Sequence, residues 1–177
     1  MARIRKGCSY RRVERAYTRI SKFREKSFIR ITPHPKIVRY DMGEMQKKFQ
    51  YTLDLISKNR LQIRDNAIES ARQTSNRFLE KKLGATGYFY KIRIYPHHIL
   101  RENPLAAGAG ADRMSTGMAH SFGKPIGIAA QIREGQTLFT LNVDKSNIEV
   151  AKQALERASK KLPCSCRISI VENKVAA

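Results

Sequence analysis

Residues 61–96, LQIRDNAIESARQTSNRFLEKKLGATGYFYKIRIYP, carry the clearest structural pattern in the chain. Apolar or small residues recur at helical spacing over residues 67–83, and Gly84 is a typical residue at the end of a helix. Asn66 and Glu69 predict a capping box at the helix start. The short strand LQIR precedes the helix, and the β-branched and aromatic strand YFYKIRIYP follows it. This stretch predicts a strand–helix–strand unit.

A second unit repeats this order of elements. Residues 137–143, TLFTLNV, alternate as a strand does, and Ser146 with Glu149 predicts another capping box before a helix with an apolar stripe. Residues 166–172, CRISIVE, form the strand after that helix, and GKPIGIAAQI at 123–132 predicts one more strand. We expect two strand–helix–strand units packed in one α+β domain, with the helices on the sheet.

Composition divides the rest of the chain. Residues 1–30 hold 11 Lys and Arg but only two Glu, and their apolar residues keep no sustained period. We expect them to form an extended basic N-terminal arm that buries little by itself. The single α+β domain should span residues 31–172, followed by a tail at 173–177. Within it, residues 101–124 predict a long internal loop, which we expect to be mobile without a partner, and loops of this length are usually functional.

The net charge is the strongest functional signal. The chain has 35 Lys and Arg against 15 Asp and Glu, a formal charge of +20, which is more than solubility requires. Such an excess attracts polyanions, of which nucleic acid is the commonest. A membrane surface is the competing partner, but the cations are scattered rather than opposed to one apolar helical face.

Location follows from what the sequence lacks. The N-terminus is charged from its third residue and has no apolar signal region, and no apolar run approaches the roughly 18 residues of a spanning helix. Three cysteines give no disulfide framework and fit a reducing compartment. We expect a soluble, cytoplasmic protein.

The glycine-rich stretch GAGADRMSTGMAHSFGKP, residues 108–125, has a composition that could form a phosphate-binding loop. Arg113 stands where a dinucleotide fingerprint needs its third glycine. Gly123 and Lys124 precede Pro125, which lacks the N–H that a nest of backbone donors requires. The spacing therefore favours a flexible or RNA-contacting loop over a nucleotide site.

Metal and catalytic sites find little support. Cys164 and Cys166 form a C-x-C pair, but structural zinc usually takes four ligands and no second pair exists. We therefore interpret them as ordinary thiols. His97 and His98 are expected to close a strand and to point to opposite faces, so they cannot face one metal without a β-bulge. No catalytic motif occurs, so we expect no enzyme activity, no cofactor, no metal and no small-molecule substrate.

The basic arm points to RNA. Arg outnumbers Lys eight to three in residues 1–30, and a guanidinium binds phosphate through two hydrogen bonds and stacks on bases. Tyr10, Tyr17 and Phe23 lie between the cations and could stack on unpaired bases. A merely solvated basic face or a localisation signal is the alternative. The candidate RNA-binding residues of the arm are Arg3, Arg5, Lys6, Arg11, Arg12, Arg15, Arg19, Lys22 and Arg24.

Several motifs together resemble one family. LREN (100–103), GAGADRMSTGM (108–118) and FGKP (122–125), in this order, closely resemble the archaeal and eukaryotic branch of the L-sixteen/L-ten-e family of large-subunit ribosomal proteins. PHPKIVRYDMG, LISKNRLQIRDNAIESAR and GYFYKIRIYPHHILREN are similar to the same family, as is the KLP junction before the last strand. The resemblance covers residues 5–171. Ala119 and His120 depart from the basic residue and glycine common after TGM.

This resemblance implies a structural role on large-subunit rRNA and an α+β fold with a hammerhead-like β motif. It implies that the loop 101–124 reaches toward the peptidyl-transferase centre and tRNA acceptor ends, with Arg101, Arg113 and Lys124 facing RNA. It also implies support of late subunit assembly and contacts with neighbouring ribosomal proteins. A free-standing RNA-binding ribosome-assembly factor, and behind it an RNA-modifying enzyme, remain alternatives.

Overall fold

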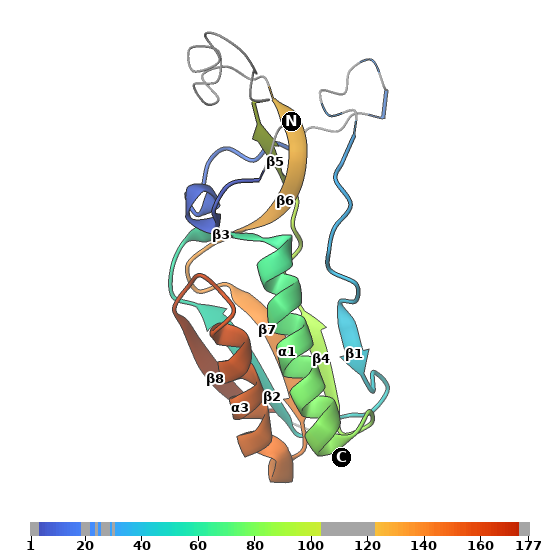
Figure 1. Cartoon of the computed structure of the whole chain (residues 1–177). Coiled ribbons are helices and arrows are strands. Elements are labelled where there is room, and N and C mark those ends of the chain that lie inside the picture. The colour runs from blue at the N-terminus through green and yellow to red at the C-terminus, as the bar shows by residue number, and fades with distance from the viewer. Residues whose placement is uncertain are drawn as a thin grey trace.

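The computed structural model describes residues 4–18, 22, 23, 25, 29, 31–103 and 123–173. These residues form an elongated molecule with a helix-covered five-stranded sheet at one end and a smaller three-stranded sheet toward the other (Figure 1). Helices and antiparallel sheets occur together, which confirms the α+β expectation. No helix among the described residues is both long and apolar enough to cross a membrane.

The five-stranded sheet is entirely antiparallel and has the order β1-β4-β7-β2-β8. β2 and β4 alternate buried and partly exposed positions, whereas the central strand β7 is buried at four consecutive positions despite its alternating sequence. One detail of the strand order was not predicted: β2 lies between β7 and β8, which are the two strands of the second unit. The strands are β1 (Asp41–Gly43), β2 (Tyr51–Ser57), β4 (Tyr88–Ile92), β7 (Thr137–Val143) and β8 (Cys166–Glu172).

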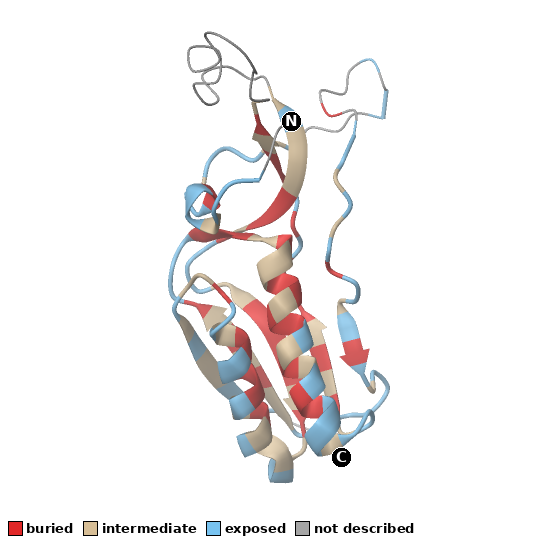
Figure 2. Cartoon of the chain, in the orientation of Figure 1, coloured by how far each residue is buried: buried red, intermediate tan, exposed pale blue. Residues whose placement is uncertain are grey.

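Two helices, α1 (Asp65–Leu83) and α3 (Ile148–Ser159), lie side by side on one face of this sheet (Figure 1). Their buried stripes meet the buried positions of the strands, and Figure 2 shows red segments on both helices and on the strands behind them. Leu53 and Leu55 of β2 pair with Leu141 and Phe139 of β7 in this layer. Burial of this apolar face holds the helices on the sheet.

Both predicted capping boxes are wrong. Helix α1 begins at Asp65, one residue before Asn66, because the extended residue Arg64 leads directly from strand into helix. Glu69 instead makes an ion pair with Arg72 at 2.6 Å. Helix α3 is preceded by a 3₁₀ turn, Lys145–Asn147, which contains Ser146 and takes it away from the cap position.

The smaller sheet has the order β3-β6-β5 and is also antiparallel. Its strands are β3 (Leu61–Arg64), β5 (His98–Glu102) and β6 (Lys124–Ile132). The first unit therefore has its two strands in different sheets, since β3 pairs here while β4 belongs to the five-stranded sheet. Strands β5 and β6 correct two expectations. His98 begins β5 rather than closing a strand. Arg101 lies on β5 and Lys124 on β6, so both are on paired strands rather than in a loop.

The described part of the basic arm is mostly exposed, as the sequence predicts, but two of its apolar side chains are buried. Residues 4–18, the N-terminal segment, contain a 3₁₀ turn, η1 (Gly7–Tyr10), which lies against the three-stranded sheet (Figure 1). Tyr10 is only 8% exposed and packs with Leu100 and Ala129. Ile29 is 5% exposed and packs with Ile99 and Ile128. Tyr10 and Ile29 thus pack singly against the sheet, whereas Ile4 and Phe23 are 47% and 67% exposed.

Candidate nucleic-acid interface

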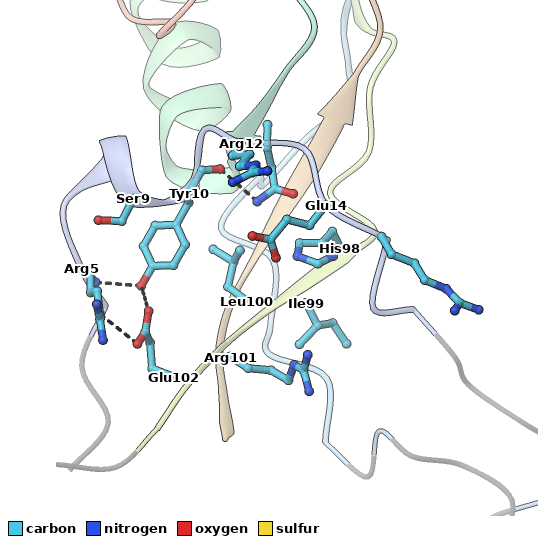
Figure 3. Close-up of a pocket in the computed structure, with 12 residues that line it drawn as sticks. Arg5, Ser9, Tyr10, Arg12, Glu14, His98, Ile99, Leu100, Arg101 and Glu102 are labelled. Carbon is cyan, nitrogen blue, oxygen red and sulfur yellow. Dashed lines mark hydrogen bonds and ion pairs between the residues drawn. The ribbon is translucent and has the colours of Figure 1, made fainter. Parts of the chain in front are cut away.

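A polar pocket of about 320 Å³ lies between the N-terminal segment and β5 (Figure 3). Four arginines and two glutamates give it an excess of positive charge. Gln62 comes from β3 and the remaining lining residues come from the N-terminal segment and β5. The lining consists of Arg5, Ser9, Tyr10, Arg12, Glu14, Arg15, Gln62, His98, Ile99, Leu100, Arg101 and Glu102.

One wall of the pocket is fixed by a buried tyrosine and glutamate. The Tyr10 hydroxyl donates to Glu102 Oε1 at 2.8 Å and accepts the Arg5 backbone N–H at 2.9 Å. The Arg5 side chain reaches the other carboxylate oxygen, with 3.0 Å between Nε and Oε2. Burial, more than any other influence, raises the pKa of Tyr10 above 10, so this hydroxyl remains a donor at neutral pH. The positive charge of Arg5 thus balances the negative charge of the buried Glu102 carboxylate through their ion pair.

A pair of glutamines holds the backbone of the N-terminal segment. Gln62 uses its side-chain amide to donate to the Tyr10 carbonyl at 3.0 Å, and its backbone N–H donates to the Arg11 carbonyl at 2.9 Å. Gln131 of β6 donates to the Glu14 carbonyl at 2.9 Å and to Gln62 Oε1 at 3.1 Å. These hydrogen bonds hold the backbone of the segment along the sheet. They use its backbone carbonyls and none of its arginine side chains.

His98 and Arg101 hold the segment farther along. The Tyr17 backbone N–H donates to His98 Nδ1 at 2.9 Å, and the Ile99 N–H donates to the Tyr17 carbonyl at 3.3 Å. Burial lowers the pKa of His98 below 6.5; the negative charge of Glu14 opposes this shift and the positive charge of Arg101 adds to it. The imidazole is thus neutral at pH 7, as an accepting Nδ1 requires. The Arg101 guanidinium lies 3.8 Å from the centre of the Tyr17 ring.

Arg12 and Arg15 differ from the arginines that hold the segment. Both line the pocket and both are exposed. Within the described part of the chain, neither forms an ion pair with a carboxylate, whereas Arg5 does. Two exposed guanidiniums on a fixed backbone are well suited to bind an anion such as a phosphate, since each offers planar pairs of donors.

The predicted RNA-binding residues thus divide into groups. The structure brings Arg5, Arg12, Arg15 and Arg101 together around one pocket. Four other predicted cations lie on the surface away from its lining: Lys6, Arg11, Lys22 and Lys124. Four more lie outside the described residues, as do most residues of the predicted loop: Arg3, Arg19, Arg24 and Arg113.

Sequence reasoning missed the residues that build the pocket. Tyr10 was interpreted as a surface for stacking bases, but its ring is buried and the Arg64 guanidinium lies 5.8 Å from the ring centre. Gln62, His98 and Glu102 lie within the motifs that resemble the family, but those motifs did not indicate a pocket. Their side chains act through hydrogen bonds to residues at least 52 positions away, for which the sequence contains no signal.

The metal and thiol interpretations concern other parts of the molecule. No group of three or more metal-ligating side chains is found within the described residues. Cys8, Cys164 and Cys166 are free thiols.

Comparison with known proteins gives a consistent result. A sequence profile described as ribosomal protein L16p/L10e matches residues 14–169. The chain is 45% identical over 172 residues to the large ribosomal subunit protein uL16 of Methanococcus maripaludis, covering 97% of this chain and 96% of the relative. It is 44% identical to uL16 of Staphylothermus marinus, covering 89% and 91%. Identity to uL16 of Archaeoglobus fulgidus is 42%, covering 91% and 89%.

Proposed function

The chain belongs to the L16p/L10e family of ribosomal proteins, and from this premise we propose that its pocket between the N-terminal segment and β5 binds large-subunit rRNA. The protein is a structural component of the large ribosomal subunit rather than an enzyme, and it resides with the ribosome in the cytoplasm. Its partners are therefore rRNA and other ribosomal proteins. The step proposed beyond family membership is which residues contact the RNA.

The observation that carries the proposal is the unequal use of the pocket arginines. Arg5 and Arg101 are engaged within the protein, by Glu102 and the Tyr17 ring respectively. Arg12 and Arg15 have no carboxylate partner among the described residues and stand on a backbone fixed by Gln62 and Gln131. A backbone fixed before binding lowers the entropy cost of ordering these side chains on a phosphate.

The same reasoning extends to the remaining predicted cations. We propose that Lys6, Arg11, Lys22 and Lys124 supply additional phosphate contacts from the exposed surface, because exposed cations release counterions when they bind RNA. Arg3, Arg19, Arg24 and Arg113 remain predicted contacts outside the described residues.

We also propose that the connection between β5 and β6 reaches toward the peptidyl-transferase centre and tRNA acceptor ends, and that the protein supports late subunit assembly. The family resemblance of the GAGADRMSTGM and FGKP motifs supports this. The pairing of Glu102 with Lys124 adds that the connection leaves and returns at one end of the three-stranded sheet.

Salt-dependent binding tests the pocket. A double variant, Arg12→Gln with Arg15→Gln, should bind a large-subunit rRNA transcript more weakly than the unaltered chain. Its log affinity should also fall less steeply with log salt, by about 0.7 to 0.9 per lost contact. The control, Arg77→Gln with Lys160→Gln, removes two exposed cations from the helix layer and should retain the slope. Equal slopes for the two double variants would reject the pocket as the RNA site.

Sedimentation separates a subunit constituent from a free-standing assembly factor. Large subunits washed at high salt should retain close to one copy of this protein each. Release of the protein by the wash, with subunits otherwise intact, would favour the assembly-factor alternative.

A further inference from the structure

Cys164 and Cys166 bring two thiols together outside the proposed interface. They flank Ser165 in the turn between the end of α3 and the start of β8. Their sulfur atoms are 3.5 Å apart, and both side chains are partly buried. Adjacent sulfurs in a C-x-C pair require both side chains to point to the same side of the turn, which an extended strand would also allow but a helix would not.

The backbone around the pair is held by β2. The Lys58 N–H donates to the Ser165 carbonyl at 2.9 Å, and Cys166 is the register partner of Ser57. The Cys166 thiol also lies 3.7 Å from the Cys164 carbonyl oxygen. The backbone that carries the two sulfurs is therefore fixed at Ser165 and Cys166, which keeps the thiols near each other.

The two thiols differ in reactivity. The hydrogen bond between the two sulfur atoms lowers the pKa of Cys164 to about 7. The same contact raises the pKa of Cys166, so Cys166 keeps its proton when Cys164 has lost its own. Near neutral pH a large share of Cys164 is therefore present as the nucleophilic thiolate, beside a Cys166 that is still a thiol.

We propose that Cys164 and Cys166 are a site of reversible oxidation, at which a low-molecular-weight disulfide converts the two thiols into an intramolecular disulfide. The Cys164 thiolate attacks one sulfur of the small disulfide and forms a mixed disulfide, while the other half leaves as a thiolate and takes up a proton. Cys166 then loses its proton to solvent and attacks the Cys164 sulfur, which expels the second half as a thiol. Two protein thiols and one small disulfide become one protein disulfide and two small thiols.

Zinc binding is a weaker interpretation of the same pair. Zinc sites in proteins usually have three or four protein ligands. No third metal-ligating side chain joins Cys164 and Cys166 among the residues the structure describes. Two sulfurs in contact, one of them readily ionised, match the needs of disulfide exchange more closely.

Oxidised glutathione tests the proposal on the full-length chain. Cys8 is exposed and is first changed to Ser, so that Cys164 and Cys166 are the remaining thiols. After incubation at pH 7 the intact mass of this Cys8→Ser chain should fall by two hydrogen atoms and return on reduction. Fragment sequencing of the tryptic peptide 162–167 should place the link between the two cysteines. Unchanged thiols, or a stable glutathione adduct on the Cys8→Ser chain, would overturn the proposal.

Two further variants assign the steps. In the Cys8→Ser background, Cys166→Ser should stop at a mixed disulfide on Cys164, because the second thiol is missing. Cys164→Ser should react with oxidised glutathione about fivefold more slowly at pH 7 than the Cys8→Ser chain, because an ordinary thiol such as the remaining one is mostly protonated there. If Cys164→Ser reacted as fast as the Cys8→Ser chain that keeps both cysteines, the assignment of Cys164 as the attacking sulfur would be wrong.

Discussion

The buried hydroxyl of Tyr10 offers a direct measure of how firmly the N-terminal segment is held. Tyr10→Phe keeps the packed ring but removes the group that joins the Arg5 backbone to Glu102. A hydrogen bond to a charged group contributes roughly 1.5–3 kcal/mol. The lower part of this range applies because Glu102 keeps its Arg5 ion pair and the pocket admits water. We expect a loss of about 1.5–2 kcal/mol in the free energy that opposes detachment of the segment.

Native-state hydrogen exchange measures this loss. The Gln62 N–H donates to the Arg11 carbonyl, so its exchange reports detachment of the segment. Its protection should fall about tenfold to thirtyfold in Tyr10→Phe, while amides of β7 should keep theirs. Tyr51→Phe is the matched control, because Tyr51 also donates to a glutamate, Glu172, but on the exposed surface at 3.1 Å. Unchanged Gln62 protection in Tyr10→Phe would refute the reasoning, as would an equal fall in the Tyr51→Phe control.

Two other predictions concern acid sensitivity and a glycine. Since burial lowers the pKa of His98 below its unfolded value of 6.5, the stability it supplies is present above pH 6.5 and lost as pH falls below it. The protection factor of the Tyr17 amide should fall in this window, and a His98→Gln variant should lack the pH dependence. Gly43 has φ +85° and an added Cβ would lie 2.2 Å from the Tyr88 carbonyl oxygen, so Gly43→Ala should cost about 2–4 kcal/mol in urea unfolding. Gly135→Ala, at φ +75° in open space, should cost about 1 kcal/mol, and equal losses would exclude the clash.

The elements were predictable where the sequence carries a local period. The helix over residues 67–83 and the strand TLFTLNV follow from spacing alone, and both are confirmed. The pairing of strands was not predictable, since β2 lies between β7 and β8 although neither is its neighbour in sequence. Alternation specifies that a strand has a buried face but not which strand lies beside it.

The candidate site was predictable only in its charge. Arginines interleaved with tyrosines are typical both of a segment that stacks on RNA and of one that packs on its own protein. What decides between the two is the presence of Glu102 and His98. Glu102 accepts a hydrogen bond from the Tyr10 hydroxyl and His98 accepts one from the Tyr17 backbone, so both tyrosines contact their own protein. A buried carboxylate 92 residues away leaves no trace in the local pattern of the arm. Arg12 and Arg15 were predicted with the other cations, and only the fold showed that neither has a carboxylate partner among the residues the structure describes.

The place of β2 in the sheet has a consequence for synthesis of the chain. β2 ends at Ser57, yet its partner β8 begins at Cys166, more than a hundred residues later. At about 5–20 residues per second, roughly 5–20 s pass before that partner has been made. During this interval β2 has an unpaired edge on a highly basic nascent chain, a state prone to aggregation and to nonspecific capture by RNA. A chaperone that shields this edge until the last strand emerges would protect the protein at its most vulnerable stage.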